Sequence, residues 1–366
     1  MRTADVVVIG GGCVGLSALY HLASFGCTDT VLLEGDALGA GSTGKAAGGI
    51  RVQHQDELNT RLVLRSLEEF TRFEELTATP IDFKQVGYLY LFDDEADLAS
   101  FSRAARIQRR FGATTEVLGV DAVRDLVPYA TTDDLCGATF CSLEGYATPE
   151  AVVQGYARAA RRLGATIAVG TPAVEILTDG VGVCGVRTAR ETISTREVVV
   201  AAGVASPDLT RPLGFELPVH GEAHTIFYSS QSGGVPDDAP LVIDYSASFY
   251  FRREGGGLIF AGPQSDLEKL SEPATHRLPS IADISIERSW WGYYEMSPDR
   301  NAMIGQAPVP GLYYATGFSG HGFMQSPGVG EHLAEVVLRR EPTLDLSPMS
   351  VDRFASGHKR AETFGV

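Results

Sequence analysis

The first fifteen residues contain the feature that most restricts how this chain can fold. Four consecutive aliphatic residues, Val6 to Ile9, predict a strand buried on both faces, as in a parallel sheet covered by helices. Three glycines with the spacing Gly-x-Gly-x-x-Gly follow. Gly10 permits a sharp turn, Gly12 lets the backbone approach a pyrophosphate, and Gly15 lets the next helix pack closely on the strand. This pattern predicts a βαβ unit that binds a dinucleotide at a helix N-terminus.

The residues after the glycines support this interpretation. Apolar side chains recur at helical spacing from Val14 to Leu22, and residues 30–33 predict a second strand that ends at Glu34. An acid at this position can bind the hydroxyl groups of an adenosine ribose and disfavours a 2′-phosphate, so FAD or NAD is favoured over NADP. The alternative is a glycine-rich turn in an ordinary βαβ unit, with Glu34 merely solvated.

Size and charge limit the possible functions. A chain of 366 residues favours two closely packed domains over a single core. The net charge of -16 argues against binding to nucleic acid or to an anionic membrane, although one arginine could still hold an anionic small substrate. The five cysteines lack C-x-x-C spacing, and the first strand starts too early to leave room for a signal peptide. We therefore expect a reduced, cytoplasmic protein without a metal site.

A second glycine-rich segment covers residues 39–51 and ends in Arg51. Segments of this composition are usually flexible linkers. This one lies just downstream of the nucleotide fingerprint, and its small side chains would let the backbone lie against a large planar cofactor. Contact with a cofactor is therefore favoured over a linker.

The fingerprint, Glu34 and the run Gly-Ser-Thr-Gly-Lys-Ala-Ala-Gly-Gly-Ile-Arg at 41–51 resemble the D-amino-acid-oxidase-like superfamily of FAD-dependent oxidoreductases. The likeness is to the branch of sarcosine oxidases, dimethylglycine dehydrogenases and β subunits of proline dehydrogenases. It implies that Arg51 stands near the reactive face of the flavin. It also implies that the flavin is lined by Ser42, Thr43, Lys45, Gly48, Gly49 and Ile50.

The run Tyr-Ala-Thr-Gly-Phe-Ser-Gly-His-Gly-Phe-Met at 314–324 resembles the second flavin-binding motif of this family. A strand, a glycine loop and a helix at about 327–339 would present backbone donors to the cofactor. The resemblance also places the backbone of Val174 at the adenine, with Ala202 and Gly203 beside the cofactor. The donors are expected among Gly317, Gly320, His321, Gly322, Phe323 and Met324. A local structural role for His321 is favoured over a role as general base.

The order of predicted elements indicates an α/β protein with an inserted α+β domain. A Rossmann-like FAD-binding domain is expected to comprise residues 1–85, 146–216 and 296–366. Residues 86–145 and 217–295 would form an antiparallel-sheet substrate domain, with strands at 241–244, 249–253 and 258–261. We also expect one helix over 56–76, a strand over 83–92 and a helix over 95–111. Tyr250 and Arg252 are either pocket residues or structural ones.

The chain departs from the pattern of this family in several ways. Lys45 stands where some members bind FAD through a histidine, and Gly292 stands where others use a cysteine, which implies noncovalent FAD. Met324 stands where some relatives carry a lysine that binds the substrate carboxylate, so Arg51 is the remaining candidate to bind this carboxylate. The alternative role of Arg51 is an ion pair with an acid of its own domain. Leu258 to Phe260 contain no lysine for activating oxygen, which leaves oxidase and dehydrogenase both open.

The sequence thus predicts FAD-dependent oxidation of an amine by hydride transfer to flavin N5, followed by hydrolysis of the imine. Secondary or tertiary amino acids, such as N-methyl or proline-like compounds, are the favoured substrates. Oxygen or another electron acceptor would reoxidise the flavin. The protein could form a homo- or hetero-oligomer. The alternatives are a glycine or D-amino-acid oxidase, a flavin-binding electron-transfer subunit of a heteromeric dehydrogenase, and an NAD enzyme.

Overall fold

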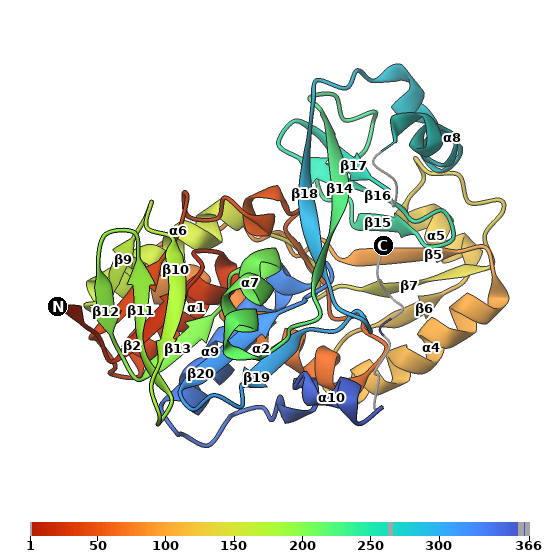
Figure 1. The fold of residues 1–366 in the computed structure, drawn as a ribbon. Helices are drawn as coiled ribbons and strands as arrows, with labels where there is room; N and C mark the ends of the chain where they lie inside the picture. Colours follow the sequence, from red (N-terminus) through yellow and green to blue (C-terminus); the bar gives the residue numbers. More distant parts are fainter. Residues whose placement is uncertain (1, 263–265, 358–361, 363–366) are drawn as a thin grey trace.

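A computed structural model of the chain describes residues 2–262, 266–357 and 362. Two lobes are visible in Figure 1, one built on the sheet that contains β2 and the other on the sheet that contains β5. Both lobes draw on segments that are far apart in the sequence, and the long strands β14 and β18 lie between them. The fold is mixed α/β with several sheets, as the sequence predicts.

The central sheet of the first lobe has six strands in the order β19-β20-β13-β2-β3-β9. All neighbouring pairs are parallel except β19 with β20. All four residues of β2 are buried, because helices cover one face and a smaller sheet covers the other. The strands are β2 (Val6–Ile9), β3 (Thr30–Leu33), β9 (Thr166–Ala168), β13 (Glu197–Val200), β19 (Met303–Gln306) and β20 (Leu312–Thr316).

The helical face carries one apolar core, in which α1 packs against both α6 and α9. The helices of this layer are α1 (Cys13–Ser24), α2 (Glu57–Thr71), α3 (Phe73–Thr77), α6 (Pro149–Arg162) and α9 (Gly322–Val337). The opposite face is covered by a four-stranded sheet of β1 (Arg2–Thr3), β12 (Thr192–Ser194), β11 (Val183–Thr188) and β10 (Ala173–Thr178). Short helices α7 (Ser206–Thr210) and α10 (Asp352–Ala355) complete the lobe. A two-stranded ribbon pairs β4 (Gly49–Ile50) with β8 (Gly145–Tyr146).

The second lobe contains an eight-stranded sheet with the order β18-β14-β17-β16-β15-β5-β7-β6. Its strands are β5 (Tyr88–Phe92), β6 (Glu116–Leu118), β7 (Gly137–Cys141), β14 (His220–Ser229), β15 (Leu241–Asp244), β16 (Phe249–Glu254), β17 (Gly257–Ala261) and β18 (Arg288–Met296). The helices of this lobe are α4 (Glu95–Arg110), α5 (Val120–Leu126) and α8 (Leu267–Arg277). One pair, β5 with β15, is parallel, whereas the alternating pattern predicts only antiparallel strands. The two strands are more than a hundred residues apart, so no hairpin fixes their relative direction.

Three predicted elements differ in extent from the observed ones. The helix expected over 56–76 ends at Thr71, and α3 begins after Arg72. The strand expected over 83–92 begins only at Tyr88. The helix expected from about 327 begins five residues earlier, at Gly322, and Pro327 lies inside it. As the sixth residue of the helix, Pro327 cannot donate to the carbonyl oxygen of Phe323, and the Ser326 hydroxyl donates to that oxygen instead at 2.8 Å.

Candidate cofactor and substrate site

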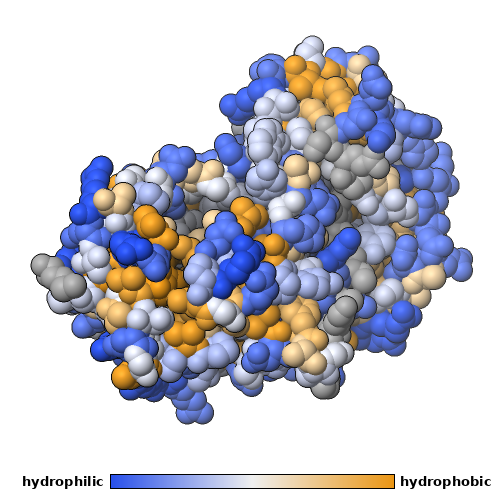
Figure 2. Space-filling view, viewed as in Figure 1, coloured by the Kyte–Doolittle hydropathy of each residue, from blue (hydrophilic) through white to orange (hydrophobic). Residues whose placement is uncertain are grey.

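A cavity of about 610 Å³ runs from the glycine turn after β2 to the sheet of the second lobe. This volume is within the range of sites that bind small molecules. Figure 2 shows apolar side chains at the surface over β10 to β12. Val174 lines the cavity and is 56% exposed, whereas Arg51, which also lines it, is buried. The cavity therefore reaches from the protein surface into the interior.

The glycine turn has no room for side chains. Gly10 has φ +113°, and a Cβ atom on it would lie 2.2 Å from the carbonyl oxygen of Ala201. A Cβ on Gly15 would lie 2.0 Å from the carbonyl oxygen of Gly10. Helix α1 then begins without a side-chain cap at Gly12 and without an acid in its first turn. Apart from Cys13, whose N–H donates to Thr43 Oγ1, the N–H groups of the first turn have no side-chain acceptor among the described residues, and the positive helix end lines the cavity, an arrangement suited to a pyrophosphate.

Glu34 lies at the same end of the cavity. Its Oε2 accepts a hydrogen bond from Gly11 N at 2.7 Å, and its Oε1 accepts one from Asp36 N at 2.7 Å. The carboxylate is half-buried and held in one orientation, not merely solvated. Because each carboxylate oxygen has a second lone pair, Glu34 retains the capacity to accept from the hydroxyl groups of a ribose.

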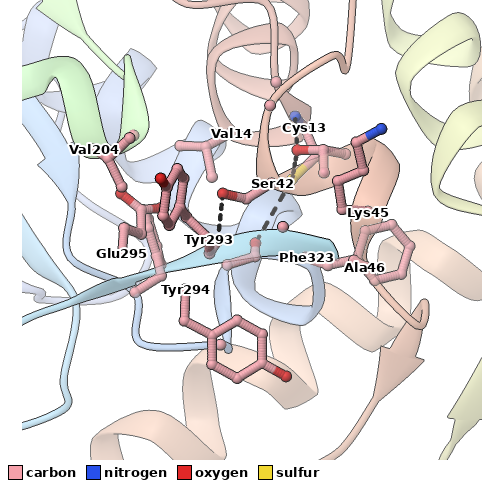
Figure 3. A pocket seen from close by; sticks show the side chains of 18 of the residues that line it. Cys13, Val14, Ser42, Lys45, Ala46, Val204, Tyr293, Tyr294, Glu295 and Phe323 are labelled. Carbon is pink, nitrogen blue, oxygen red and sulfur yellow. Dashed lines mark hydrogen bonds between the residues drawn. The ribbon is translucent and has the colours of Figure 1, made fainter. Parts of the chain in front are cut away.

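The glycine-rich segment closes over the start of α1 and is tied to β18. Thr43 Oγ1 accepts from Cys13 N at 3.2 Å, and Ser42 Oγ donates to the carbonyl oxygen of Tyr293 at 2.7 Å (Figure 3). The indole of Trp290 donates to the carbonyl oxygen of Lys45 at 3.1 Å. The segment is therefore an ordered wall of the cavity, and the linker alternative does not describe it.

The structure places most of the predicted cofactor residues around this cavity. Lining positions include Gly10, Gly12, Val14, Glu34, Ser42, Thr43, Lys45, Gly48, Gly49, Val174, Ala202, Gly203, Gly320, His321, Gly322, Phe323 and Met324. Gly15, Ile50 and Gly317 lie behind the lining. Gly15 packs on the glycine turn, Ile50 is fully buried, and the N–H of Gly317 donates to Glu295.

The far end of the cavity holds a buried cation. Arg51 is 4% exposed, its Nη1 donates to the carbonyl oxygen of Gln53, and its guanidinium lies 5.7 Å from the ring centre of Tyr90. Glu144 fixes the backbone next to it by accepting from Val52 N at 2.5 Å and from Gln53 N at 2.7 Å. Burial raises the pKa of the Glu144 carboxyl to about 7. These contacts hold the Arg51 side chain at the cavity wall.

His321 occupies the N-cap position of α9 beside this cation. The side chain is buried, and no hydrogen bond of its ring appears among those of the described residues. Burial and the positive charge of Arg51 keep the pKa of His321 well below its ordinary value. The ring of His54 lies 5.1 Å from it and is itself paired with Glu362 at 3.1 Å. A neutral imidazole therefore faces the cavity.

Aromatic side chains of the second lobe form the remaining wall of this end. Tyr250 lines the cavity as expected, and burial raises its pKa well above the ordinary value, so it is a neutral phenol. Tyr294 stacks on His224 with ring centres 3.9 Å apart. Arg252 serves a structural purpose instead, because its Nε donates to the carbonyl oxygen of Ala47 at 2.9 Å and its Nη1 contacts Glu254.

Sequence reasoning missed several lining residues. They are His224, Tyr293, Tyr294 and Glu295, which no local motif marks. Tyr88 and Tyr90 also line the cavity, and they lie on a strand that the sequence predicts as part of the wall over the flavin. They come from strands that pair only in the folded sheet, so their convergence depends on register. Glu295 lies in the run Tyr-Glu-Met-Ser-Pro at 294–298, and an acid among the apolar residues of a strand is a signal that could have identified it.

Some classes of site find no support in the structure. No group of three or more His, Cys, Asp or Glu side chains suited to a metal occurs among residues 2–262, 266–357 and 362. The five cysteines are free thiols. None of the helices in the described part of the chain has the length and apolar content needed to span a bilayer.

Comparisons with known proteins agree with this geometry. The family profile described as "FAD dependent oxidoreductase" (DAO) matches residues 5–336. The 4-methylaminobutanoate oxidase (formaldehyde-forming) of Paenarthrobacter nicotinovorans is 28% identical over 98% of this chain and 46% of that protein. Mitochondrial sarcosine dehydrogenase of Homo sapiens is 28% identical over 96% of this chain and 41% of that protein. The chain thus spans less than half the length of these relatives.

Other similar proteins match along most of their length. Sarcosine oxidase subunit beta of Rhizobium meliloti (strain 1021) is 27% identical over 96% of this chain and 89% of that protein. The crystal structure of L-proline dehydrogenase from P. horikoshii has a TM-score of 0.91 and 30% identity over 98% of this chain and all of that chain. Glycine oxidase from Geobacillus kaustophilus, at 23% identity and a TM-score of 0.85, shares the fold.

Proposed function

Since the chain belongs to the family of FAD-dependent oxidoreductases, we propose that it binds FAD in the cavity and oxidises an amine that carries a carboxylate. The favoured substrates are secondary or tertiary amino acids, such as N-methyl amino acids or proline-like compounds. One observation carries this proposal: a single cavity joins a glycine turn fit for a pyrophosphate to a buried guanidinium beside a neutral imidazole.

The residues around the cavity fit FAD from end to end. The turn at 10–15 and the start of α1 would hold the pyrophosphate, and Glu34 would hold the adenosine ribose. Residues 42–49 and the start of α9 would hold the ring system, with backbone N–H groups directed at it. When bound, FAD supplies the acceptor for the hydride that leaves the carbon next to the amine nitrogen.

Arg51 would anchor the substrate through its carboxylate. A guanidinium presents a rigid pair of donors that matches the two oxygens of a carboxylate, and burial strengthens such a pair. The phenol rings of Tyr88, Tyr90 and Tyr250 would surround the apolar part of the substrate and exclude water. The anchored substrate would then present one carbon to the cofactor in a fixed orientation.

His321 would remove the proton that an amino acid carries on its nitrogen at neutral pH. Only the free amine has the lone pair that stabilises loss of hydride from the adjacent carbon. The low pKa of His321 makes its ring nitrogen a weak acceptor for this proton and a ready donor to water, so the imidazole would relay the proton and not hold it. The imine product would hydrolyse in water.

FAD would be held without a covalent bond. Lys45 and Gly292 stand at the positions where some relatives carry a histidine or a cysteine that binds FAD. The two residues pack against each other in the cavity wall. Cys13 also lines the cavity, but burial raises the pKa of its thiol, which disfavours the nucleophilic thiolate. Acid precipitation is expected to leave a colourless pellet and a yellow supernatant. A yellow, fluorescent pellet would contradict noncovalent binding.

The relatives support an amine substrate and also a second possibility. Their names specify a methylamino acid, sarcosine and proline as substrates of those proteins. Oxidation of glycine or D-amino acids remains the nearest alternative substrate class. The likeness to a sarcosine oxidase β subunit along 89% of its length favours, as a second candidate, a flavin-binding subunit of a heteromeric enzyme. We also propose that the protein is cytoplasmic, that it forms an oligomer, and that it consists of a discontinuous FAD-binding domain and a discontinuous substrate domain.

A substrate panel under anaerobic conditions tests the proposal. The purified protein should be yellow, and N-methyl amino acids or proline should bleach the visible absorption band of its oxidised flavin. Glycine and D-amino acids in the same panel separate the alternative substrate classes. Bleaching by dithionite without bleaching by any amine would favour the electron-transfer subunit, and a colourless protein that binds NAD would overturn the proposal.

A further inference from the structure

A buried histidine and a buried carboxylate lie behind His321, and the proposed chemistry gives neither of them a role. His54 Nδ1 lies 3.1 Å from Oε2 of Glu362, and both side chains are fully buried. His321 lines the cavity, whereas His54 and Glu362 are not among its lining residues. His54 follows Arg51 in the sequence, and Glu362 comes from a segment more than three hundred residues away. The pair therefore stands one layer away from the substrate.

Glu362 is held in place by its backbone and by its side chain. Its backbone N–H donates to the carbonyl oxygen of Asp299 at 3.1 Å. Its Oε2 accepts from the backbone N–H of Gln55 at 3.4 Å and shares a proton with His54 Nδ1. A glutamic acid in a model peptide is more acidic than an imidazole by about two pKa units, so the shared proton resides on His54. Burial raises the pKa of the Glu362 carboxyl, but the bond from His54 and the positive charges nearby lower it to about 2.

This contact selects one tautomer of the His54 ring. With the proton on Nδ1, the ring is neutral and Nε2 carries a lone pair, and no hydrogen-bond partner of this Nε2 occurs in the described part of the chain. Burial and the charge of Arg51 lower the pKa of His54, which keeps the ring neutral. The other titratable groups that act on the pair are Asp56, at the start of α2, and the phenols of Tyr90 and Tyr245.

The orientation of His321 depends on this ring. No hydrogen bond of the His321 side chain occurs within residues 2–262, 266–357 and 362. Its ring packs against that of His54 instead, with centres 5.1 Å apart and planes at 75°, which is the edge-to-face arrangement that aromatic rings prefer. A group that receives a proton must present its nitrogen within hydrogen-bond reach of the donor. The His54 ring is therefore the contact that can fix this geometry.

Resting on the proposed function, we propose that Glu362 is a positioning residue, which through the ring of His54 holds His321 in the orientation that receives the proton of the substrate nitrogen. This proton passes from the ammonium nitrogen to a ring nitrogen of His321 and from there to water. His54 and Glu362 keep their own protons unchanged throughout. Their loss should therefore slow the removal of the substrate proton and leave the binding of FAD unaffected.

Reduction of the flavin in the full-length holoenzyme tests this role across pH. The rate constant is measured anaerobically with proline and with sarcosine between about pH 6 and pH 10, a range in which the amine of the substrate loses its proton. Glu362→Ala should be about 10- to 100-fold slower than wild type near pH 7, which is part of what a positioned base contributes. The difference should disappear as pH rises, because the free amine needs no base. The dissociation constant for FAD, from fluorescence quenching, should equal that of the wild type.

Three further variants separate positioning from a general effect on the fold. Glu362→Gln, whose amide oxygen can accept the same two bonds, should restore most of the rate that Glu362→Ala loses. Glu362→Ala added to His321→Gln should cause no further loss, because both changes act through one ring. Glu341→Ala, which removes an exposed carboxylate, is the matched control and should reduce its flavin at the wild-type rate.

NMR of the apoprotein with isotope-labelled histidine gives a readout that does not depend on activity. The wild type should show an imidazole N–H protected from exchange, the Nδ1–H of His54. This signal should be absent from His54→Ala and from Glu362→Ala and present in Glu362→Gln. Melting temperatures verify that each variant is folded.

Different results would overturn different claims. A wild-type rate in Glu362→Ala, or a loss of equal size at every pH, would overturn the positioning role. A further loss when Glu362→Ala is added to His321→Gln would show that Glu362 does not act through His321. Glu362→Gln as slow as Glu362→Ala would assign the effect to the lost charge and overturn positioning by hydrogen bonds. Failure of every amine to reduce the wild-type flavin would instead overturn the proposed function.

Discussion

Replacement of Arg51 by lysine is the sharpest test of how the substrate is held. Arg51→Lys keeps the positive charge at the buried end of the cavity but removes the planar pair of donors. A carboxylate bound by two charge-assisted hydrogen bonds would lose one of them. Such a bond contributes about 1.5–3 kcal/mol, so binding should weaken roughly 10- to 150-fold.

The structure explains why lysine cannot compensate. Glu144 fixes the backbone at Val52 and Gln53, so the loop has no freedom to move a shorter group toward the substrate. The loss should therefore appear mainly as a raised KM for amino acids, with a smaller effect on kcat.

Matched substrates isolate the contact with the carboxylate. Anaerobic flavin reduction is measured for proline and for pyrrolidine, which lacks the carboxylate, and likewise for sarcosine and dimethylamine. The variant should lose affinity for the amino acids and change little for the simple amines. An equal loss for both members of a pair would show that Arg51 acts on the fold or the cofactor and would refute its role as carboxylate anchor.

Three further predictions concern the turn, the proposed base and a buried ion pair. Gly10→Ala should lower both FAD affinity and melting temperature, since φ is +113° and the added Cβ would lie 2.2 Å from the Ala201 carbonyl oxygen. The control Gly26→Ala, with φ +98° and open space around the added Cβ, should lower stability alone. Equal FAD affinity in the two variants would contradict the role of the Gly10 turn in binding the cofactor. His321→Gln should lower kcat/KM most at low pH and regain it as pH rises and the free amine becomes abundant; a constant ratio to wild type across pH would exclude the role as base. Burial lowers the pKa of His21, but the carboxylate of Glu69, 3.1 Å away, outweighs burial and raises this pKa above its ordinary value of 6.5. The ion pair therefore stabilises the fold fully below about pH 6.5 and less as pH rises through the pKa of the folded state. Over that range the melting temperature of the wild type should fall more than that of His21→Gln, and parallel curves would count against this role.

Local patterns predicted the part of the site that lies on the chain's own turns. The strand Val6–Ile9, the turn after it and the strand Thr30–Leu33 are observed with the predicted bounds. Each depends on neighbouring residues: a run of aliphatic side chains, glycines that only a tight turn requires, and an acid just after a strand. For the same reason the glycine-rich segment before Arg51 could be assigned to the cavity from composition and position.

The wall that faces the substrate could not be predicted in the same way. Tyr88 lies opposite Leu241 across a parallel pair of strands separated by more than a hundred residues, and no local pattern specifies that pairing. The environment of His321 also depends on distant parts of the chain, since His54 and its partner Glu362 come from two other segments. Its neighbouring glycines suggested local hydrogen bonds, whereas its ring makes none with the described residues and faces the cavity.

The central claim is that one cavity holds FAD along its length and a carboxylate-bearing amine at its buried end. A crystal structure of the FAD-loaded protein with propionate, a short carboxylate that cannot be oxidised as an amine, tests it most directly. The account predicts the adenosine ribose at Glu34, the flavin ring between residues 42–49 and the start of α9, and the carboxylate paired with Arg51 beside His321. A carboxylate bound elsewhere, or an Arg51 paired with an acid of the protein while FAD is bound, would contradict it.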